Sequence, residues 1–263
     1  MTVDITSFSN PKIKDLVKLQ TKKRERDKKG LIVIEGKQEI ELAWQNGIKI
    51  KELFQCPEWD NKGTSIKRAN FPIFQVSKQV FAKASYREHP DGFLAVAVPP
   101  ADKKLRKIKM SPKPLLLVLE GVEKPGNLGA ILRTADAAGV DAVIINQEKT
   151  DIYNPNVIRT SRGSVFSKQI VTASRGETIS WLQDNKIQTI ATVVDAEKNY
   201  TEVNLKRGSA LVMGEESQGL SRSWQEQADQ KVVIPMQGQV NSLNVSVSAA
   251  ILTFEAVRQR SEN

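Results

Sequence analysis

The chain has 263 residues, enough for two domains of ordinary size, and 40% of them are hydrophobic. Its single cysteine, Cys56, excludes an internal disulfide, and its single histidine, His89, leaves too little for a histidine-based metal site or a Ser-His-Asp triad. We therefore predict no metal site, and we place His89 on the surface.

The formal charge of +9 is unevenly distributed. Residues 1–110 contain 23 lysines and arginines against 13 acidic residues, whereas residues 111–263 contain 16 against 17. This excess is typical of a polyanion-binding module joined to a nearly neutral domain, although a solvated basic face gives the same count. The chain has neither a long apolar run nor the start of a signal peptide, so we expect no membrane association and a cytoplasmic location.

In the amino-terminal part, short apolar segments alternate with helix-like ones. Ser9 and Pro11 indicate the start of a first helix, and a second helix ends at Gly47. The dense basic run 21–30 is either a solvated helix face or a contact surface for a polyanion. Apolar runs of strand length occupy 31–35, 50–54, 71–76 and 92–98. This alternation predicts a small α/β domain.

A boundary between two domains is predicted after the last of these apolar runs. The stretch 98–114 is rich in proline and lysine and has no sustained apolar pattern. We therefore place the first domain at 1–105, a linker at 106–114 and a second domain at 115–263.

The second domain alternates more regularly. Six apolar, β-branched runs predict strands at 115–122, 142–146, 165–171, 187–194, 209–214 and 231–235. Helical segments separate several of them, and a helix over 244–259 follows the last. Strands of this kind favour a mostly parallel sheet covered on both faces, with ligands bound at the carboxyl ends of the strands.

Three loops at predicted strand ends carry unusual residues. In the first, a turn at Pro125–Asn127 is followed by Gly129 and then by Arg133 in a helix. An ordinary strand-to-helix turn, with its arginine paired to a carboxylate, would also fit. The spacing matches neither a G-x-G-x-x-G dinucleotide motif nor a P-loop, which disfavours a nicotinamide-dependent dehydrogenase.

The other two loops follow the last two strands. In the second loop, Gly214-Glu215-Glu216 leads to Gly219, and the spacing around Ser217 does not fit a hydrolase nucleophile. In the third loop, Ser242-Leu243-Asn244 leads directly into the last helix, which either polar residue could simply cap.

Taken together, the three loops resemble the motifs of a known family. N-x-G-x-x-x-R, G-E-E-x-x-G-L-S and I-P-M-x-G-x-V-x-S-L-N-V-S-V-x-A-A occur in this order. They are similar to the motifs of the SpoU/TrmH RNA ribose methyltransferases over about residues 115–260. The basic amino-terminal part resembles the substrate-binding domain of many members, a small α/β fold shared with some RNA-binding ribosomal proteins.

The resemblance implies an α/β trefoil-knot fold, a homodimer formed through the knot region, and methyl transfer from S-adenosylmethionine to a ribose 2′-hydroxyl. The cofactor positions that it implies are Met213, Gly214, Ile234, Met236, Ser242 and Leu243. The catalytic positions that it implies are Asn127, Arg133, Glu216, Ser242 and Asn244.

Chemistry refines the role of one of these residues. An arginine guanidinium keeps its proton in proteins, so we expect Arg133 to orient the hydroxyl and stabilise the developing alkoxide rather than remove the proton. The last helix is apolar on more than one side, in agreement with burial in a dimer or in its own domain.

The resemblance implies an RNA substrate, and the basic domain favours ribosomal RNA of the 23S type over transfer RNA. A non-catalytic RNA-binding or ribosome-assembly protein on the same fold is the alternative. The intact motif residues argue against it.

Overall fold

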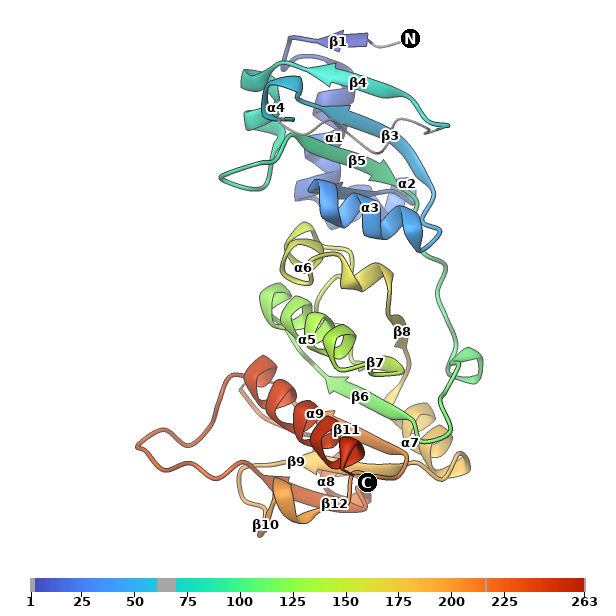
Figure 1. Cartoon of the computed structure of the whole chain (residues 1–263), viewed down its shortest axis with the longest axis vertical. Helices are drawn as coiled ribbons and strands as arrows, with labels where there is room; N and C mark the ends of the chain where they lie inside the picture. Colours follow the sequence, from blue (N-terminus) through green and yellow to red (C-terminus); the bar gives the residue numbers. More distant parts are fainter. Residues whose placement is uncertain (1–2, 61–69, 216, 263) are drawn as a thin grey trace. The chain divides into compact units, whose positions relative to one another are not determined.

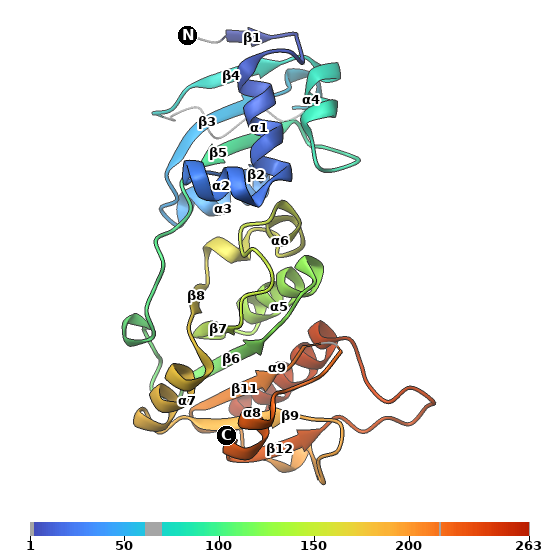
Figure 2. The same cartoon turned by 180° about the vertical axis from the view of Figure 1, so that it is seen from behind.

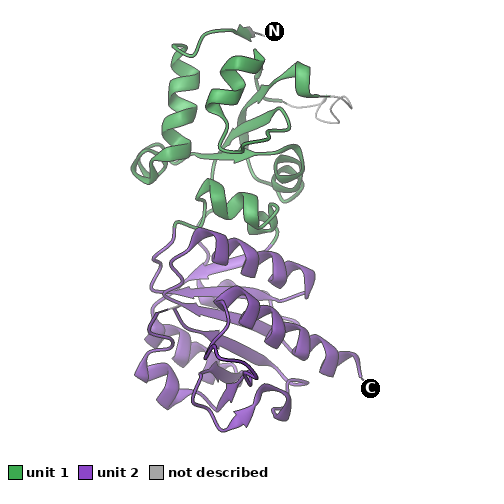
Figure 3. Cartoon of the chain, turned by 90° about the vertical axis from the view of Figure 1, so that its left-hand side faces the viewer, with its two compact units in different colours: residues 1–101, 151–167 green, residues 102–150, 168–263 purple. Residues whose placement is uncertain are grey.

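The computed structural model describes residues 3–60, 70–215 and 217–262. It divides into two compact units, which we call unit 1 (residues 1–101 and 151–167) and unit 2 (residues 102–150 and 168–263) (Figure 3). The segment 151–167, which the sequence places inside the second domain, therefore lies with the amino-terminal unit. Among the described residues, no helix is both long and apolar enough to cross a membrane.

Unit 1 contains a five-stranded mixed sheet in the order β1-β4-β3-β5-β2 (Figure 1). The β1, β4 and β3 strands are parallel to one another, and β5 runs antiparallel to both β3 and β2. Four of the strands were predicted, and the short β1 was missed. The strands are β1 (Val3–Ile5), β2 (Ile32–Glu35), β3 (Ile50–Gln55), β4 (Ile73–Val76) and β5 (Phe93–Ala97).

Helices cover both faces of this sheet. One face packs on apolar residues of α1 and α4, while α3 contacts β2 and β5. The first helix is capped by Asn10, not by Ser9, because the Asn10 side chain accepts a hydrogen bond from the Lys12 amide at 2.9 Å. The elements of this unit are α1 (Pro11–Thr21), α2 (Lys23–Lys29), α3 (Lys37–Gln45), η1 (Pro57–Trp59), α4 (Lys78–Ala84), α6 (Pro155–Thr160) and η3 (Ser164–Phe166).

Unit 2 is built on a seven-stranded sheet in the order β10-β12-β9-β11-β6-β7-β8, and every pairing is parallel. The predicted parallel sheet is thus confirmed. The predicted strand 165–171 is wrong in its first half, because Ser167 donates back to Ser164 in a 3₁₀ turn and cannot join the ladder there. The strands are β6 (Leu115–Glu120), β7 (Ala142–Asn146), β8 (Gln169–Thr172), β9 (Gln188–Thr192), β10 (Lys198–Asn199), β11 (Ser209–Met213) and β12 (Gln230–Val233).

The helices of unit 2 form a layer on each face of the sheet (Figures 1 and 2). Leu182 of α7 and the fully buried Trp224 of α8 pack in one core cluster with Val118 and Val212 of the strands. On the other face, α5 and α9 contact each other. The helical elements are η2 (Leu105–Lys107), α5 (Pro125–Ala137), α7 (Arg175–Asp184), η4 (Tyr200–Glu202), α8 (Arg222–Gln227) and α9 (Val245–Ser261). Residues 102–114 belong to unit 2 and contain only the short η2, and Ile108 packs in the core cluster of this unit.

Candidate active site

The first motif forms the start of α5. The predicted turn at Pro125–Asn127 is wrong: the helix already begins at Pro125, a residue favoured at the first helical position because its missing N–H is not needed there. Gly129 is consequently a buried helical residue. Asn127 is buried and Arg133 is exposed. Arg133 has no hydrogen-bond or ion-pair partner among the described residues, so its guanidinium is available to a ligand.

The second motif begins where β11 ends. A Cβ on Gly214 would lie 2.2 Å from the carbonyl carbon of Gly219, so the two backbones approach more closely than any side chain allows. The Gly219 amide donates to the Glu215 carbonyl at 3.0 Å and closes the loop. Glu216, which the family resemblance marks as catalytic, lies outside the described residues.

The third motif meets the first through two asparagines. Asn244 caps α9, since its side-chain oxygen accepts from the Ser246 amide at 2.9 Å. Its Nδ2 also donates to Oδ1 of Asn127 at 3.1 Å, although 117 positions separate the two residues. The capping role that the sequence allowed is therefore real, but it is only half of what Asn244 does.

A cavity of about 650 Å³ lies between the second and third motif loops. This volume is in the range of small-molecule sites. The six predicted cofactor residues all line it, together with Asn244: they are Met213, Gly214, Ile234, Met236, Ser242 and Leu243. Lys124 and Glu215 are the charged groups among its described lining residues, so neutral polar and apolar surface dominates.

Lys149 joins two of the loops around this cavity. Its Nζ lies 2.7 Å from Glu123 and 2.5 Å from Glu215, the residue before Glu216. The hydrogen bond from Lys149, helped by one from Ser217, lowers the pKa of Glu215. The carboxylates in turn raise the pKa of Lys149. The loop between β7 and α6 therefore holds the first and second motif loops together at one edge of the sheet.

Sequence reasoning missed part of the cavity wall. Thr192, Val193 and Val194 line it at the carboxyl end of β9, and the Val194 side chain is 68% exposed. The signal was available, because β9 was predicted and ligands bind beyond the carboxyl ends of parallel strands. That β9 would pair with both β11 and β12 could not be predicted from the order of the strands along the chain.

Comparison with known proteins agrees with the motifs. Residues 114–254 match the model of the SpoU rRNA Methylase family. The chain belongs to this family. Residues 10–95 match the MRM3-like substrate binding domain, which confirms the predicted nature of the amino-terminal part.

One relative and two solved structures illustrate matches along nearly the whole chain. The 23S rRNA (guanosine(2553)-2'-O)-methyltransferase RlmP of Bacillus subtilis is 32% identical over 250 residues, covering 95% of this chain and 97% of the relative. The crystal structure of an RNA 2'-O ribose methyltransferase superposes with a TM-score of 0.87 at 42% identity, covering 98% and 99% of the two chains. An AdoMet-bound rRNA methyltransferase from Sinorhizobium meliloti gives 0.87 at 30% identity, with 98% of each chain covered.

Proposed function

We propose that this protein transfers a methyl group from S-adenosylmethionine to a ribose 2′-hydroxyl of 23S-type ribosomal RNA. The observation that carries the proposal is a cavity lined by the second and third motif loops in a chain of this family, with the first motif joined to the third by the Asn127–Asn244 hydrogen bond. The names of the relatives support the reaction and the RNA class. The basic substrate-binding domain supports RNA as the substrate.

The cavity suits the methyl donor. The apolar side chains of Ile234, Met236 and Leu243 line it and would cover the adenine ring. Gly214 and Gly219, whose backbones approach closely, also line it. Bound there, S-adenosylmethionine would supply an electrophilic methyl group.

The chain's own residues would position the hydroxyl. We propose that Arg133, which has no described carboxylate partner, donates hydrogen bonds to the ribose 2′-oxygen and stabilises the negative charge that develops on it. The Asn127–Asn244 hydrogen bond would fix the start of α5 relative to the third motif loop. Ser242 is exposed at the cavity and would contact the reactants. The hydroxyl proton would leave to water, to an RNA phosphate or to Glu216.

The test is transfer of labelled methyl from S-adenosylmethionine to total RNA separated by size, with Arg133→Ala beside the wild type. Label in 23S rRNA that depends on Arg133 and maps to a ribose 2′-oxygen supports the proposal. Label in transfer RNA would change the substrate class. Cofactor binding without any labelling of RNA that lacks the modification would favour the non-catalytic RNA-binding alternative.

We further propose a homodimer formed through α9. Val245, Leu252 and Ala256 of this helix are buried within unit 2, whereas Val247 and Phe254 are 46% and 48% exposed. Large apolar side chains in two exposed positions of one helix suit a subunit interface. Light scattering at micromolar concentration should give twice the monomer mass, and Phe254→Glu should reduce it to the monomer.

Family membership and composition support two more proposals. We propose that the carboxyl-terminal segment threads through a preceding loop to form the family's trefoil knot. In single-molecule stretching from both termini, a knotted chain would stop short of its full extended length. A cytoplasmic location is also proposed, in keeping with the single buried Cys56, and cell fractionation tests it.

A further inference from the structure

The segment 151–167 lies within the compact unit that contains the substrate-binding domain (Figure 3). The substrate-binding domain model ends at residue 95, and the methylase model spans 114–254. By sequence, therefore, the segment belongs to the methylase region. Its contacts show why the fold groups it with unit 1.

A buried ion pair attaches the beginning of the segment. Arg26 of α2 is 5% exposed, and its Nε donates to Oδ2 of Asp151 at 2.9 Å. The same guanidinium donates to the carbonyl of Leu19 at 2.6 Å. Arg26, which belongs to the basic run 21–30, is therefore neutralised by Asp151 and is not available to a polyanion.

The end of the segment lies directly against α3. Gly163 has a φ of +84°, and a Cβ there would lie 3.1 Å from Cα of Glu39. Arg162, the residue before it, has a φ of 55°, in the left-handed region that non-glycine residues seldom adopt. Such a conformation persists only where the surroundings fix it, and it often occurs at functional sites.

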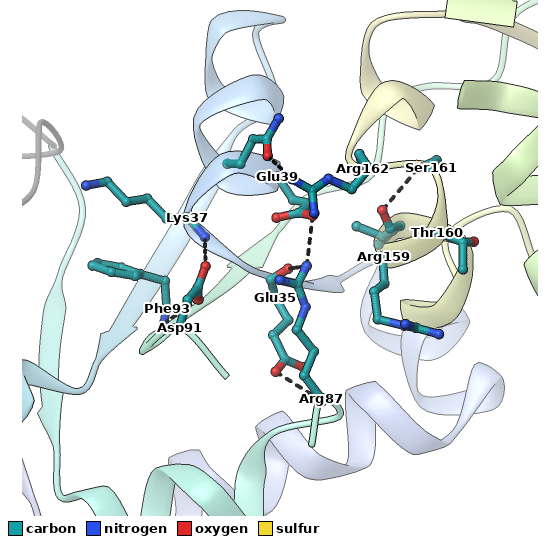
Figure 4. A network of polar contacts seen from close by, with 12 residues as sticks. Glu35, Lys37, Glu39, Arg87, Asp91, Phe93, Arg159, Thr160, Ser161 and Arg162 are labelled. Carbon is teal, nitrogen blue, oxygen red and sulfur yellow. Dashed lines mark hydrogen bonds and ion pairs between the residues drawn. The ribbon is translucent and has the colours of Figure 1, made fainter. Parts of the chain in front are cut away.

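The two carboxylates beneath this turn already have partners within unit 1 (Figure 4), an arginine for Glu39 and amide groups for Glu35. Arg87 forms an ion pair with the buried Glu39 at 2.8 Å and donates to the carbonyl of Glu35 at 2.8 Å. The Glu35 carboxylate accepts the Tyr86 amide at 2.8 Å, and burial raises its pKa. Neither Glu35 nor Glu39 is paired with the arginines of the segment.

Arg159 and Arg162 are the exposed cations of this turn. Arg159 donates to the side-chain oxygen of Asn156 at 2.7 Å, and Arg162 donates to that of Gln38 at 2.6 Å. Both acceptors are neutral amides, so they orient the guanidinium groups without cancelling their charge. The exposed Arg222 of α8, in contrast, is paired with Glu226.

We propose that Arg159 and Arg162 bind phosphate groups of the RNA backbone, which makes 151–167 a functional part of the substrate-binding unit. The inference rests on RNA being the substrate, as proposed above. An oriented guanidinium with unused N–H groups matches a phosphate, and a rigid turn loses little conformational freedom on binding. Phosphate contacts of this kind fix the position of an RNA without reading its sequence.

The test measures binding of an unmodified 23S rRNA transcript at several salt concentrations. For the double variant Arg159→Ala/Arg162→Ala, we expect affinity to fall about tenfold to a hundredfold. The slope of log affinity against log salt should become shallower by roughly 1.5, since each phosphate contact contributes about 0.7–0.9. The matched control, Arg222→Ala, removes an exposed but carboxylate-paired arginine and should change neither value.

A second variant tests the charge argument and leaves both arginines in place. Gln38→Glu would put a carboxylate beside Arg162 and should weaken RNA binding several-fold, whereas Arg162→Lys should retain most of it. Gln38 is exposed, so folding should be unaffected, which thermal melting and cofactor binding would verify.

The outcomes separate the inference from the function. The inference is overturned if the double variant Arg159→Ala/Arg162→Ala binds RNA with the affinity and the salt dependence of the wild type. An unchanged affinity in Gln38→Glu also overturns it. Arginine-dependent RNA binding without any methyl transfer supports the inference and overturns the proposed function instead. A wild-type protein that binds no RNA overturns both.

Discussion

Both units alternate strands and helices, but they differ in where their charged residues lie. Unit 2 builds its cavity mainly from neutral loop residues and from a close backbone approach at Gly214. Unit 1 buries Glu39 in an ion pair with Arg87 and Glu35 among amide donors, and it leaves Arg159 and Arg162 exposed with neutral partners. In unit 2 the cavity depends on the absence of a side chain where two backbones approach closely. In unit 1 the proposed RNA-binding surface depends on whether an arginine has a carboxylate next to it.

The largest effect is expected for a variant that lowers the catalytic rate of unit 2 without changing its fold. Arg133→Lys keeps the charge but loses the planar fork, so we expect kcat to fall roughly a hundredfold to a thousandfold, as for loss of an oxyanion-stabilising donor. Cofactor affinity, measured by calorimetry, should stay within about twofold because Arg133 does not line the cavity. Wild-type turnover in this variant would contradict the proposed role.

The next effect tests the steric basis of the cavity. In Gly214→Ala the new Cβ would meet backbone atoms of Gly219 and Leu220 at 2.2–2.4 Å, which cannot be relieved by a side-chain rotation. We expect cofactor affinity to fall at least about tenfold, with a lower melting temperature. Gly176→Ala is the matched control: it has open space within 4 Å and lies in a helix, where alanine stabilises by roughly up to 1 kcal/mol.

A smaller effect separates the two roles of Asn244. Asn244→Ser keeps a capping oxygen but loses the amide that reaches Asn127, whereas Asn244→Ala loses both. Relative to the wild type, the alanine variant should lose about 1 kcal/mol of stability and the serine variant much less. If the Asn127 contact matters for catalysis, both variants should lose activity to a similar extent. Full activity of Asn244→Ser at normal stability would show that Asn244 is only a cap.

The smallest effect concerns the charges at the edge of the cavity. Lys149→Met removes the group that lowers the pKa of Glu215, and with it the stability that the pair contributes. Because the folded pKa of Glu215 lies below its usual value, this contribution is present at neutral pH and is lost as pH falls through the folded pKa. The gap in melting temperature between wild type and variant should therefore stay constant near neutral pH and narrow only as the pH falls below 4.5, the ordinary pKa of this carboxyl group. The control is Glu123→Gln, which removes the more exposed of the two carboxylate partners of Lys149 and leaves the Lys149–Glu215 pair in place. A gap that does not change with pH would contradict this view of the pair.

The sequence alone indicated most of the strands and the parallel sheet of unit 2, and the resemblance of its motifs to a known family gave six of the residues that line the cavity. This was possible because apolar periodicity follows local geometry, and because strand ends in a parallel sheet present their loops at one edge. The three motif loops were singled out because together they resemble the family's motifs, since the first and third loops alone would also fit an ordinary turn and a helix cap.

Only the tertiary structure decided the rest. It showed that β9 lies between β11 and β12, which brings Thr192–Val194 to the cavity, and that Asn244 reaches Asn127 across 117 positions. It also showed that Arg26 is buried against Asp151, whereas Arg159 and Arg162 are exposed without a carboxylate partner. The net charge of a segment counts its ionised groups, but contacts between residues far apart in the sequence decide which charges are neutralised.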